Sequence, residues 1–499
     1  MTNEMMLTYQ TRLRLTEGQN IILQECAGLL SKVERSLYAQ VAKGKTSASC
    51  KNEFLKTYGI TGRQFNACRI SLEGKIAACK AGQEQALVSL KQQISSLDAQ
   101  VLKLEKKPSK QFALHQKKRR LGNLSCRLNS LQEDYKEGRV RLCFGGKKLF
   151  RAQFHLEENK FSSHQEWQKC WKAKRNSEFF VLGSKDETAG NQTCTAYLKN
   201  NRLSLRLRLP TSLEAKHGKY LEIENVTFAY GQQELLASLN NPKGQAISYR
   251  FKQDEKGWRV FASTALQKPE PASREEIGAI GIDLNVGHIA YVETDRFGNP
   301  IDRKRLSWVS TGKSRNQLKA LTGDICKTII DQAKKTNKPI VIEKLDFQKK
   351  KLTLKETSNS RFSRLLSGFA YGLFYTLLIA RAYKHGITVH QVNPAFTSVI
   401  GRVNYAKRYG LSIHLAAALC IARRYQQFSE APCSSEGVIP DGKKGHIAFV
   451  LPVRNRTKHV WHFWGQVKKK IITVLAAHFR AIKNRSLSPV SPTHVMGTS

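Results

Sequence analysis

Short apolar segments alternate with longer amphipathic ones through the second half of the chain, and this alternation constrains the fold more than any other feature. Strands are expected at 277–283, 288–294, 301–308, 339–345 and 387–392, and helices at about 314–335, 361–384 and 411–425. Brief apolar runs favour buried strands, whereas longer segments with apolar residues at helical spacing favour helices. The alternation predicts a mixed sheet with helices around it.

The first half of the chain combines strands with long helices. Alternating apolar and polar residues predict strands at 7–15 and 203–209, and apolar residues at helical spacing predict helices over 87–104 and 121–131. The segment between these helices, 106–120, is strongly basic. We therefore expect an antiparallel helical hairpin whose tip and flank carry positive charge.

Strand signals return after the helical hairpin. A strand is expected from about 139, followed by a turn at Gly145 and Gly146 and a second strand, which together form a β-hairpin. The pattern divides the chain into a first strand at 1–16, a helical lobe at 17–138, a β domain at 139–268, a linker at 269–274, an α/β domain at 275–432, a linker at 433–457, and a C-terminal helix with a disordered tail at 458–499.

The net charge limits the classes of function that the chain can have. Lys and Arg number 83 and Asp and Glu 39, which leaves +44 at pH 7. Small-molecule metabolism and scaffolding require no such excess, whereas nucleic-acid binding does, because Lys and Arg release counterions from phosphates. The candidate contacts are Arg202, Arg206, Arg208, Arg250 and Lys252 on two strands, Lys117, Lys118, Arg119 and Arg120 in the helical hairpin, and Arg402, Lys407 and Arg408 before the helix at 411–425. Each group is also compatible with an ordinary solvated surface.

An anionic membrane would also attract such a charge, but no segment suits one. The longest relevant uncharged run, 365–380, has sixteen residues, fewer than the roughly twenty that span a bilayer, and the N-terminus does not read as a signal peptide. The eleven cysteines are scattered without a C-x-x-C pair. We therefore expect a reduced, cytosolic protein with no structural zinc and no membrane partner.

Two acidic residues end apolar strands of the α/β domain, Asp283 in one and Glu343 in another. A carboxylate at the end of a buried strand is costly unless it holds a metal ion or a hydrogen-bond network. The pair therefore suggests a Mg²⁺ site suited to phosphodiester cleavage. Taken singly, each residue is better explained as an ordinary strand end.

Six short segments of the sequence stand out as distinctive motifs. They are GIDLN (281–285), VIEKLDF (341–347), NPAFTS (393–398), SIHLAAALCIARR (412–424), GSKDETAGNQ (183–192) and YRFKQDEKGWRVF (249–261). Together they resemble the OrfB/TnpB family, the RNA-guided nucleases of insertion sequences that are related to type V CRISPR effectors, in a branch that lacks the zinc finger. The resemblance covers almost the whole chain.

The resemblance implies an α+β multidomain protein. A β-barrel-like wedge domain, made of 1–16 and 139–268, would be split around a helical recognition lobe and followed by an RNase H-like (RuvC) α/β domain. Asp283 would be the first RuvC carboxylate and Glu343 the second, with Mg²⁺ or Mn²⁺ bound. The implied partners are a guide RNA and double-stranded and single-stranded target DNA in a prokaryotic cytosol or nucleoid; a partner transposase is also compatible.

The third position of the implied site departs from the family. Family members usually carry Asp at the start of the last RuvC helix, where this chain has His414, and 357–429 contains no acidic residue. Three interpretations stay open: His414 completes the site as a metal ligand or proton shuttle and favours Mn²⁺, Asp346 or Asp441 folds back to serve, or the nuclease is inactive. The four-cysteine zinc module of many relatives is also absent from 399–411.

The expected function is that of an RNA-guided DNA endonuclease of an insertion sequence. One alternative keeps the binding architecture without cleavage, as a guided repressor or targeting subunit. The other is a guide-independent DNA transposase or resolvase, which the large basic region ahead of the nuclease domain disfavours.

Overall fold

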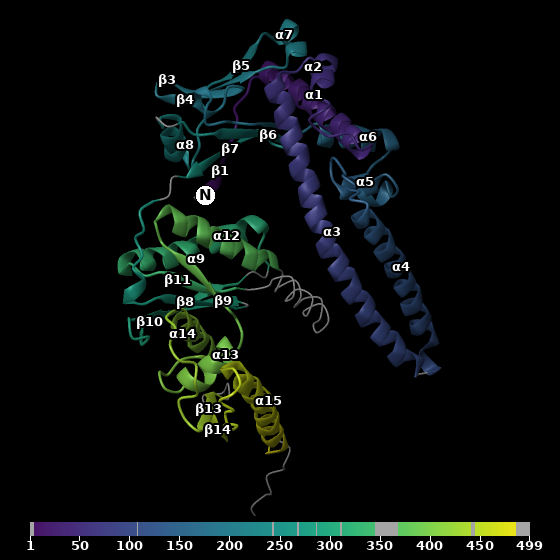
Figure 1. Cartoon of the computed structure of the whole chain (residues 1–499). Helices are drawn as coiled ribbons and strands as arrows, with labels where there is room; N and C mark the ends of the chain where they lie inside the picture. The colour runs from purple at the N-terminus through teal and green to yellow at the C-terminus, as the bar shows by residue number, and fades with distance from the viewer. Residues whose placement is uncertain are drawn as a thin grey trace, which may run out of the picture. The chain divides into compact units, whose positions relative to one another are not determined.

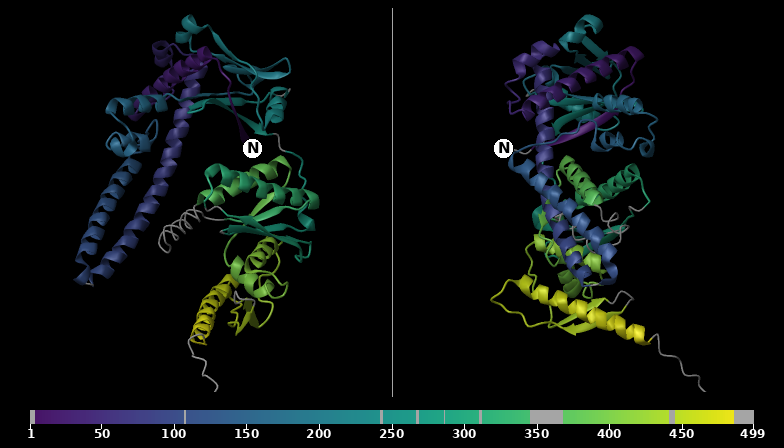
Figure 2. Two further views of the ribbon diagram at one scale, coloured as in Figure 1. Left: turned by 180° about the vertical axis from the view of Figure 1, so that it is seen from behind. Right: turned by 90° about the vertical axis from the view of Figure 1, so that its right-hand side faces the viewer.

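The computed structural model describes residues 4–106, 108–241, 244–266, 269–285, 287–309, 312–344, 368–440 and 445–485. The chain forms two compact units, Met1–Gln267 and Lys268–Ser499, each with its own core. Figures 1 and 2 show the elements of both units from three directions. Within the described residues, no helix combines the length and the apolar character that a membrane span requires.

The first unit contains the predicted helical hairpin. Its long helices and the short one between them are α1 (Glu17–Ala42), α2 (Lys51–Tyr58), α3 (Gly62–Glu105) and α4 (Gln111–Lys136). Thr16 and Thr61 cap α1 and α3, and in each case a glutamine three residues later returns a hydrogen bond to the cap. α3 and α4 pack along each other on either side of the turn η1 (Pro108–Lys110), which confirms the antiparallel hairpin (Figure 1).

Two antiparallel sheets complete the first unit. The larger has the order β1 (Met5–Arg12), β7 (Gly257–Leu266), β6 (Ile247–Asp254) and β2 (Glu178–Val181); the smaller has β3 (Cys194–Lys199), β4 (Arg202–Arg208) and β5 (Tyr220–Ile223). Because β1 pairs with β7 along its whole length, the first strand of the chain joins a sheet built mainly from residues after the helical hairpin. Short helices α7 (Thr211–His217) and α8 (Gln232–Leu239) lie between strands.

Apolar residues of α1, α3 and both sheets form one core in the first unit. Leu23, Phe65, Leu205 and Phe251 are fully buried representatives of these four sources. The predicted strand at 203–209 is confirmed as β4, whose alternate leucines face this core.

The β-hairpin predicted around Gly145 and Gly146 is wrong. The chain instead forms α5 (Lys147–Ala152) after these glycines, and then α6 (His164–Arg175). Trp167 and Trp171 of α6 bury Ala152 in a small separate cluster, and the Trp167 indole donates a hydrogen bond of 2.8 Å to the Leu149 carbonyl. Short apolar runs suit a helix as well as a strand, and packing against α6 decides between them here.

The second unit is built on the predicted mixed sheet. Its order is β10 (Pro300–Trp308), β9 (Gly287–Thr294), β8 (Ile280–Asn285), β11 (Ile340–Glu343) and β12 (Val389–Val392). The first three strands are antiparallel neighbours, whereas β11 runs parallel to both β8 and β12. Parallel pairing places the carboxyl ends of β8 and β11 at the same edge of the sheet.

Helices cover both faces of this sheet. α9 (Arg315–Thr336) and α12 (Gly368–Lys384) pack on one face against Ile280 and Ile282, and α14 (Ile413–Tyr425) packs on the other against Ala290 and Val292 (Figure 1). α14 lies very close to β8, because a Cβ atom at Gly281 would overlap the Ala418 carbonyl. The observed arrangement confirms a sheet with helices around it.

The C-terminal part of the second unit is more regular than the sequence suggests. The expected linker at 433–457 contains the antiparallel strands β13 (Glu436–Pro440) and β14 (His446–Val450), which are followed by the predicted helix, α15 (Val460–Arg485). Segment 399–411, which precedes the helix expected at 411–425, contains the end of α13 (Thr397–Ile400) and the π-helical turn η5 (Gly401–Tyr405). Ile439 and Phe449 join the core around Trp464, which explains why a segment rich in Pro, Ser and Gly is ordered.

Candidate active site at the carboxyl ends of β8 and β11

Asp283 is a buried carboxylate near the carboxyl end of β8. It is only 7% exposed, and its Oδ2 atom accepts a hydrogen bond of 2.7 Å from Asn285. Side chains alternate along a strand, so Asp283 faces α14, as Gly281 does two residues earlier. β8 therefore presents this carboxylate to the first turn of α14.

His414 meets Asp283 from that first turn. Ser412 caps α14 by accepting a hydrogen bond from the Leu415 backbone, and His414 Nδ1 lies 3.3 Å from Asp283 Oδ2. The pair that the sequence predicted is thus in direct contact. The contact joins β8 to α14 through two residues that are 131 positions apart in the sequence.

A second histidine, which sequence reasoning missed, extends this contact. The ring centroids of His414 and His288 are 4.7 Å apart at an interplanar angle of 73°, and Arg305 Nη2 lies 3.4 Å from His288 Nδ1. His288 is only 7% exposed and stands beside Asn285 across the β8–β9 pair. A polar residue at the start of the apolar strand 288–294 was the signal available in the sequence.

Glu343 occupies the matching position on the neighbouring strand. Ile342 pairs with Ile282 in parallel register, so Glu343 follows at the level of Asp283. Its Oε1 atom accepts a 2.5 Å hydrogen bond from Thr397, whose side chain is buried. Thr397 lies within the NPAFTS segment, which gives that motif a structural role that the sequence did not reveal.

The described residues do not complete the predicted three-ligand cluster. In the part of the chain that the structure describes, no group of three or more His, Cys, Asp or Glu side chains is arranged to hold a metal ion. The structure brings Asp283 and His414 together and places Glu343 on the adjacent strand. Asp346 and Asp441, considered as replacement ligands, lie outside the described residues.

A cavity of about 570 Å³ opens beside His414. Lys407, Ser412, Pro440 and His446 are among its lining residues, so one of the predicted basic contacts lies next to the candidate site. Its contributors come from the segment before α14 and from both strands of the β13–β14 hairpin. The segment that the sequence treated as a linker therefore forms one wall of this cavity.

The other two basic residues of this region have different surroundings. Arg402 is half-buried and donates a hydrogen bond of 2.7 Å to the Pro440 carbonyl, and burial lowers the pKa of its guanidinium. Arg408 is exposed and stacks over the Tyr409 ring at 5.3 Å. Arg402 thus fastens the β13–β14 hairpin, a role that a surface-charge interpretation did not predict.

The basic residues predicted on β4 and β6 are partly engaged by the protein. Arg206 stacks on the Tyr220 ring at 4.9 Å, and Arg208 lies 3.8 Å from Glu214. Arg202 donates a hydrogen bond of 3.2 Å to Asn225, and Lys252 forms an ion pair with Glu178 at 3.1 Å. Arg250 is exposed.

The basic residues in α4 divide in the same way. Lys117 donates to Gln100 at 2.7 Å and Lys118 pairs with Glu105 at 2.8 Å, so both stabilise the helical hairpin. Arg119 and Arg120 are exposed. These two arginines remain the stronger candidates for phosphate contacts in this helix.

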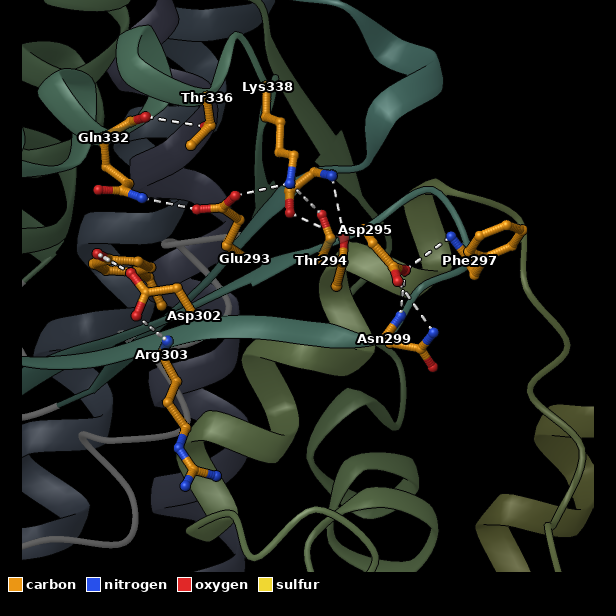
Figure 3. A network of polar contacts seen from close by, with 12 residues as sticks. Glu293, Thr294, Asp295, Phe297, Asn299, Asp302, Arg303, Gln332, Thr336 and Lys338 are labelled. Atoms are coloured by element: carbon orange, nitrogen blue, oxygen red, sulfur yellow. Dashed lines mark hydrogen bonds and ion pairs between the residues drawn. The ribbon is translucent and has the colours of Figure 1, made fainter.

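A buried polar network holds the opposite ends of the two carboxylate-bearing strands (Figure 3). Lys338 Nζ lies 2.7 Å from Glu293 Oε1 and donates to the Thr294 carbonyl at 2.8 Å, while Gln332 donates to the second Glu293 oxygen at 2.8 Å. Glu293 pairs with Ile280 at the start of β8, and Lys338 precedes β11. The network therefore ties together the starts of the strands that end near Asp283 and Glu343.

Comparisons with known proteins find matches only among solved structures. No protein-family model and no curated protein matches the sequence. The chain is similar to T. thermophilus RuvC in complex with a Holliday junction substrate, at 15% identity over 29% of this chain and 90% of that chain, with a TM-score of 0.22. It is also similar to the CRISPR-Cas12f ternary complex solved by cryo-EM, at 12% identity over 84% of this chain and 98% of that chain, with a TM-score of 0.20.

Proposed function

We propose that the chain is an RNA-guided DNA endonuclease whose second unit carries a metal-dependent phosphodiesterase site. The observation that carries the proposal is the buried Asp283 carboxylate in contact with His414, beside Glu343 on a parallel strand. Burying a carboxylate is costly without a compensating partner, and Asn285 and the His414 ring satisfy Asp283 at one oxygen. A divalent cation at the same edge of the sheet would compensate the buried charge further.

The chemical types of the donor atoms at this site suit a divalent metal ion. Asp283 and Glu343 offer the hard oxygen atoms that Mg²⁺ and Mn²⁺ accept, and the His414 imidazole shifts the preference toward Mn²⁺. Such a metal, when bound, would lower the pKa of water and neutralise charge on a phosphate. The chain's own residues hold the two carboxylates in register, and Thr397 orients Glu343 through its hydroxyl.

The first unit is proposed to bind the guide. In this assignment, 1–16 and 139–268 form a wedge domain around the recognition lobe 17–138, and the linker 269–274 leads to a RuvC-like domain at 275–432. The net charge of +44 and the exposed Arg119, Arg120 and Arg250 support phosphate binding by guide RNA and by double-stranded and single-stranded target DNA. Base pairing would then read the target sequence, while the protein contacts backbones.

A guided DNA-binding protein without cleavage is the second candidate. It is favoured by the same contact, because Asp283 Oδ2 is engaged by Asn285 and His414 and the described residues contain no cluster of three ligands. Such a protein would act as a repressor or targeting subunit. A guide-independent transposase or resolvase is the third candidate, and copurifying RNA of defined size would exclude it.

Cleavage of guide-matched duplex DNA tests the proposal. The ribonucleoprotein would be purified after expression with its native flanking DNA and assayed in Mg²⁺ and separately in Mn²⁺, beside Asp283→Ala. An exposed aspartate of α9 supplies the matched control, Asp324→Ala. We expect Asp283→Ala to abolish cleavage and retain guided binding, and Asp324→Ala to cut like the wild type.

The outcomes separate the candidates. Cleavage that survives Asp283→Ala rules out the site assignment. Guide-dependent binding by the wild type with no cut in either metal establishes the second candidate.

A further inference from the structure

A cavity of about 380 Å³ lies in the first unit, where the starts of α2 and α3 meet the smaller sheet. Three of its lining residues are cations, Lys51, Arg63 and Arg208, and three more are Asn66, Gln192 and Tyr220. Among its lining residues within the described chain, none is Asp or Glu. Its volume falls in the range of roughly 300–1,000 Å³ that is usual for ligand sites.

The cations of this cavity are held by groups behind its wall. Arg63 Nη1 lies 2.5 Å from Glu187, a carboxylate that is only 3% exposed at its side chain, and Arg208 lies 3.8 Å from Glu214. Arg208 Nε is a buried donor without a hydrogen-bond acceptor among the described residues. Two of the three cations are therefore oriented by the protein.

The walls of the cavity are joined before any ligand binds. Gln64 in the first turn of α3 donates a hydrogen bond of 3.2 Å to the Arg208 carbonyl of β4, and Ser212 N–H donates to the Gly59 carbonyl at 2.9 Å. Lys51 of α2 reaches over the same turn, because a Cβ atom at Gly62 would lie 3.5 Å from its Cε. A preformed arrangement of cations lowers the entropic cost of binding an anion.

Aromatic and amide groups stand next to these cations. The Tyr220 side chain is 42% exposed, and the Arg206 guanidinium lies 4.9 Å from its ring. An exposed ring flanked by Arg is a surface on which a nucleobase stacks. Asn66 and Gln192 have amides that both donate and accept, and either group can pair with a ribose 2′-hydroxyl, which is itself a donor and an acceptor.

We propose that this cavity binds one nucleotide of an RNA strand. Lys51, Arg63 and Arg208 bind the phosphate, Asn66 and Gln192 contact the 2′-hydroxyl, and the base stacks on Tyr220. This inference rests on the proposed function in one respect, namely that RNA is a partner of the chain. It adds a defined nucleotide subsite, formed jointly by the helical lobe and the smaller sheet.

Two matched pairs of variants test the subsite. Lys51→Gln and Lys56→Gln remove the same charge from the same helix, but only Lys51 lines the cavity. Asn66→Ala and Asn52→Ala remove the same amide, and only Asn66 lines the cavity. The full-length chain, freed of copurifying nucleic acid, is titrated by fluorescence anisotropy with an oligouridylate and an oligodeoxyuridylate of equal length.

Lys51→Gln is expected to weaken binding of the oligouridylate about tenfold, because it removes a charge-assisted contact, and Lys56→Gln less than about twofold. Asn66→Ala is expected to weaken binding of the oligouridylate about fivefold and to leave binding of the oligodeoxyuridylate unchanged, whereas Asn52→Ala should change neither affinity. All four positions are at least partly exposed, so the variants are expected to fold.

Three results would overturn the inference in different ways. If the wild type binds neither oligonucleotide, the proposed function fails together with the subsite. If Lys51→Gln and Lys56→Gln behave alike while the wild type binds RNA, the subsite is wrong and the proposed function stands. If Asn66→Ala weakens RNA and DNA equally, the recognition of ribose is wrong.

Discussion

Replacing Lys338 tests how the two carboxylate-bearing strands are held. In Lys338→Met the side chain keeps its length and apolar stem, but it loses the 2.7 Å contact with Glu293 and the 2.8 Å hydrogen bond to the Thr294 carbonyl (Figure 3). Glu293 is 3% exposed, and among the described residues its side chain keeps only the hydrogen bond from Gln332. A buried negative charge is then left without a countercharge.

The cost of this loss follows from the burial of both partners. Lys338 is 6% exposed and Glu293 3%, so solvent screens the pair weakly. Removing one member of such a pair costs about 3–5 kcal/mol of folding free energy, most of which is the penalty for the charge that remains. The double variant Lys338→Met with Glu293→Gln removes that charge and keeps an acceptor for Gln332, so we expect it to recover at least about half of the loss.

Hydrogen exchange of the β8 and β9 amides measures this effect within the second unit, without assuming that the whole chain unfolds in one step. A loss of about 3 kcal/mol in folding free energy accelerates hydrogen exchange of the slowest amides by about 150-fold. Lys335→Met, at an exposed position of α9, is the control and should shift stability by no more than about 0.5 kcal/mol. If Lys338→Met exchanges no faster than Lys335→Met, the buried pair contributes nothing and the reasoning is wrong.

Three further predictions concern the site, the sheet and the surface. His414→Asp places a third carboxylate beside the candidate site, so cleavage supported by Mg²⁺ is expected to equal or exceed that of the wild type; a loss in both metals would show that the imidazole itself is required. Gly281→Ala should lower the free energy of unfolding by about 3 kcal/mol or more, because its Cβ atom would overlap the Ala418 carbonyl. Gly372→Ala places its Cβ atom in open space, so thermal unfolding should show a neutral or stabilising effect. Arg250→Ala should weaken RNA binding and reduce the slope of log affinity against log salt by about 0.7 to 0.9, and an unchanged slope would identify this exposed arginine as a solvated side chain.

The fold was most predictable where local pattern and tertiary packing agree. The apolar runs that end at Asp283 and Glu343 form β8 and β11, because strands buried on both faces need continuous apolar sequence. The sequence also places His414 correctly in the first turn of a helix. The contact between Asp283 and His414 follows once these elements exist, since Gly281 lets α14 lie directly on β8.

Prediction failed where distant segments decide the outcome. The segment after Gly146 forms α5 because the indoles of α6 pack on it, and nothing in its own residues excludes a strand. His288 and Thr397 approach the site from other elements, so no local spacing links them to it. Arg402 looks like surface charge in the sequence, yet its partner is the carbonyl of Pro440, 38 residues away.

The packing of α14 gives the residue at position 414 its chemical importance. Gly281 and Gly401 both leave room for the backbone of α14, which seats its first turn against the end of β8. Any side chain at 414 is therefore presented to Asp283, and the identity of that side chain sets the charge of the site. An aspartate would give three carboxylates with Asp283 and Glu343, whereas a histidine leaves two. Fewer negative charges attract divalent cations less strongly, and imidazole suits Mn²⁺ better than Mg²⁺, so the side chain at 414 is expected to set the metal preference of the candidate site.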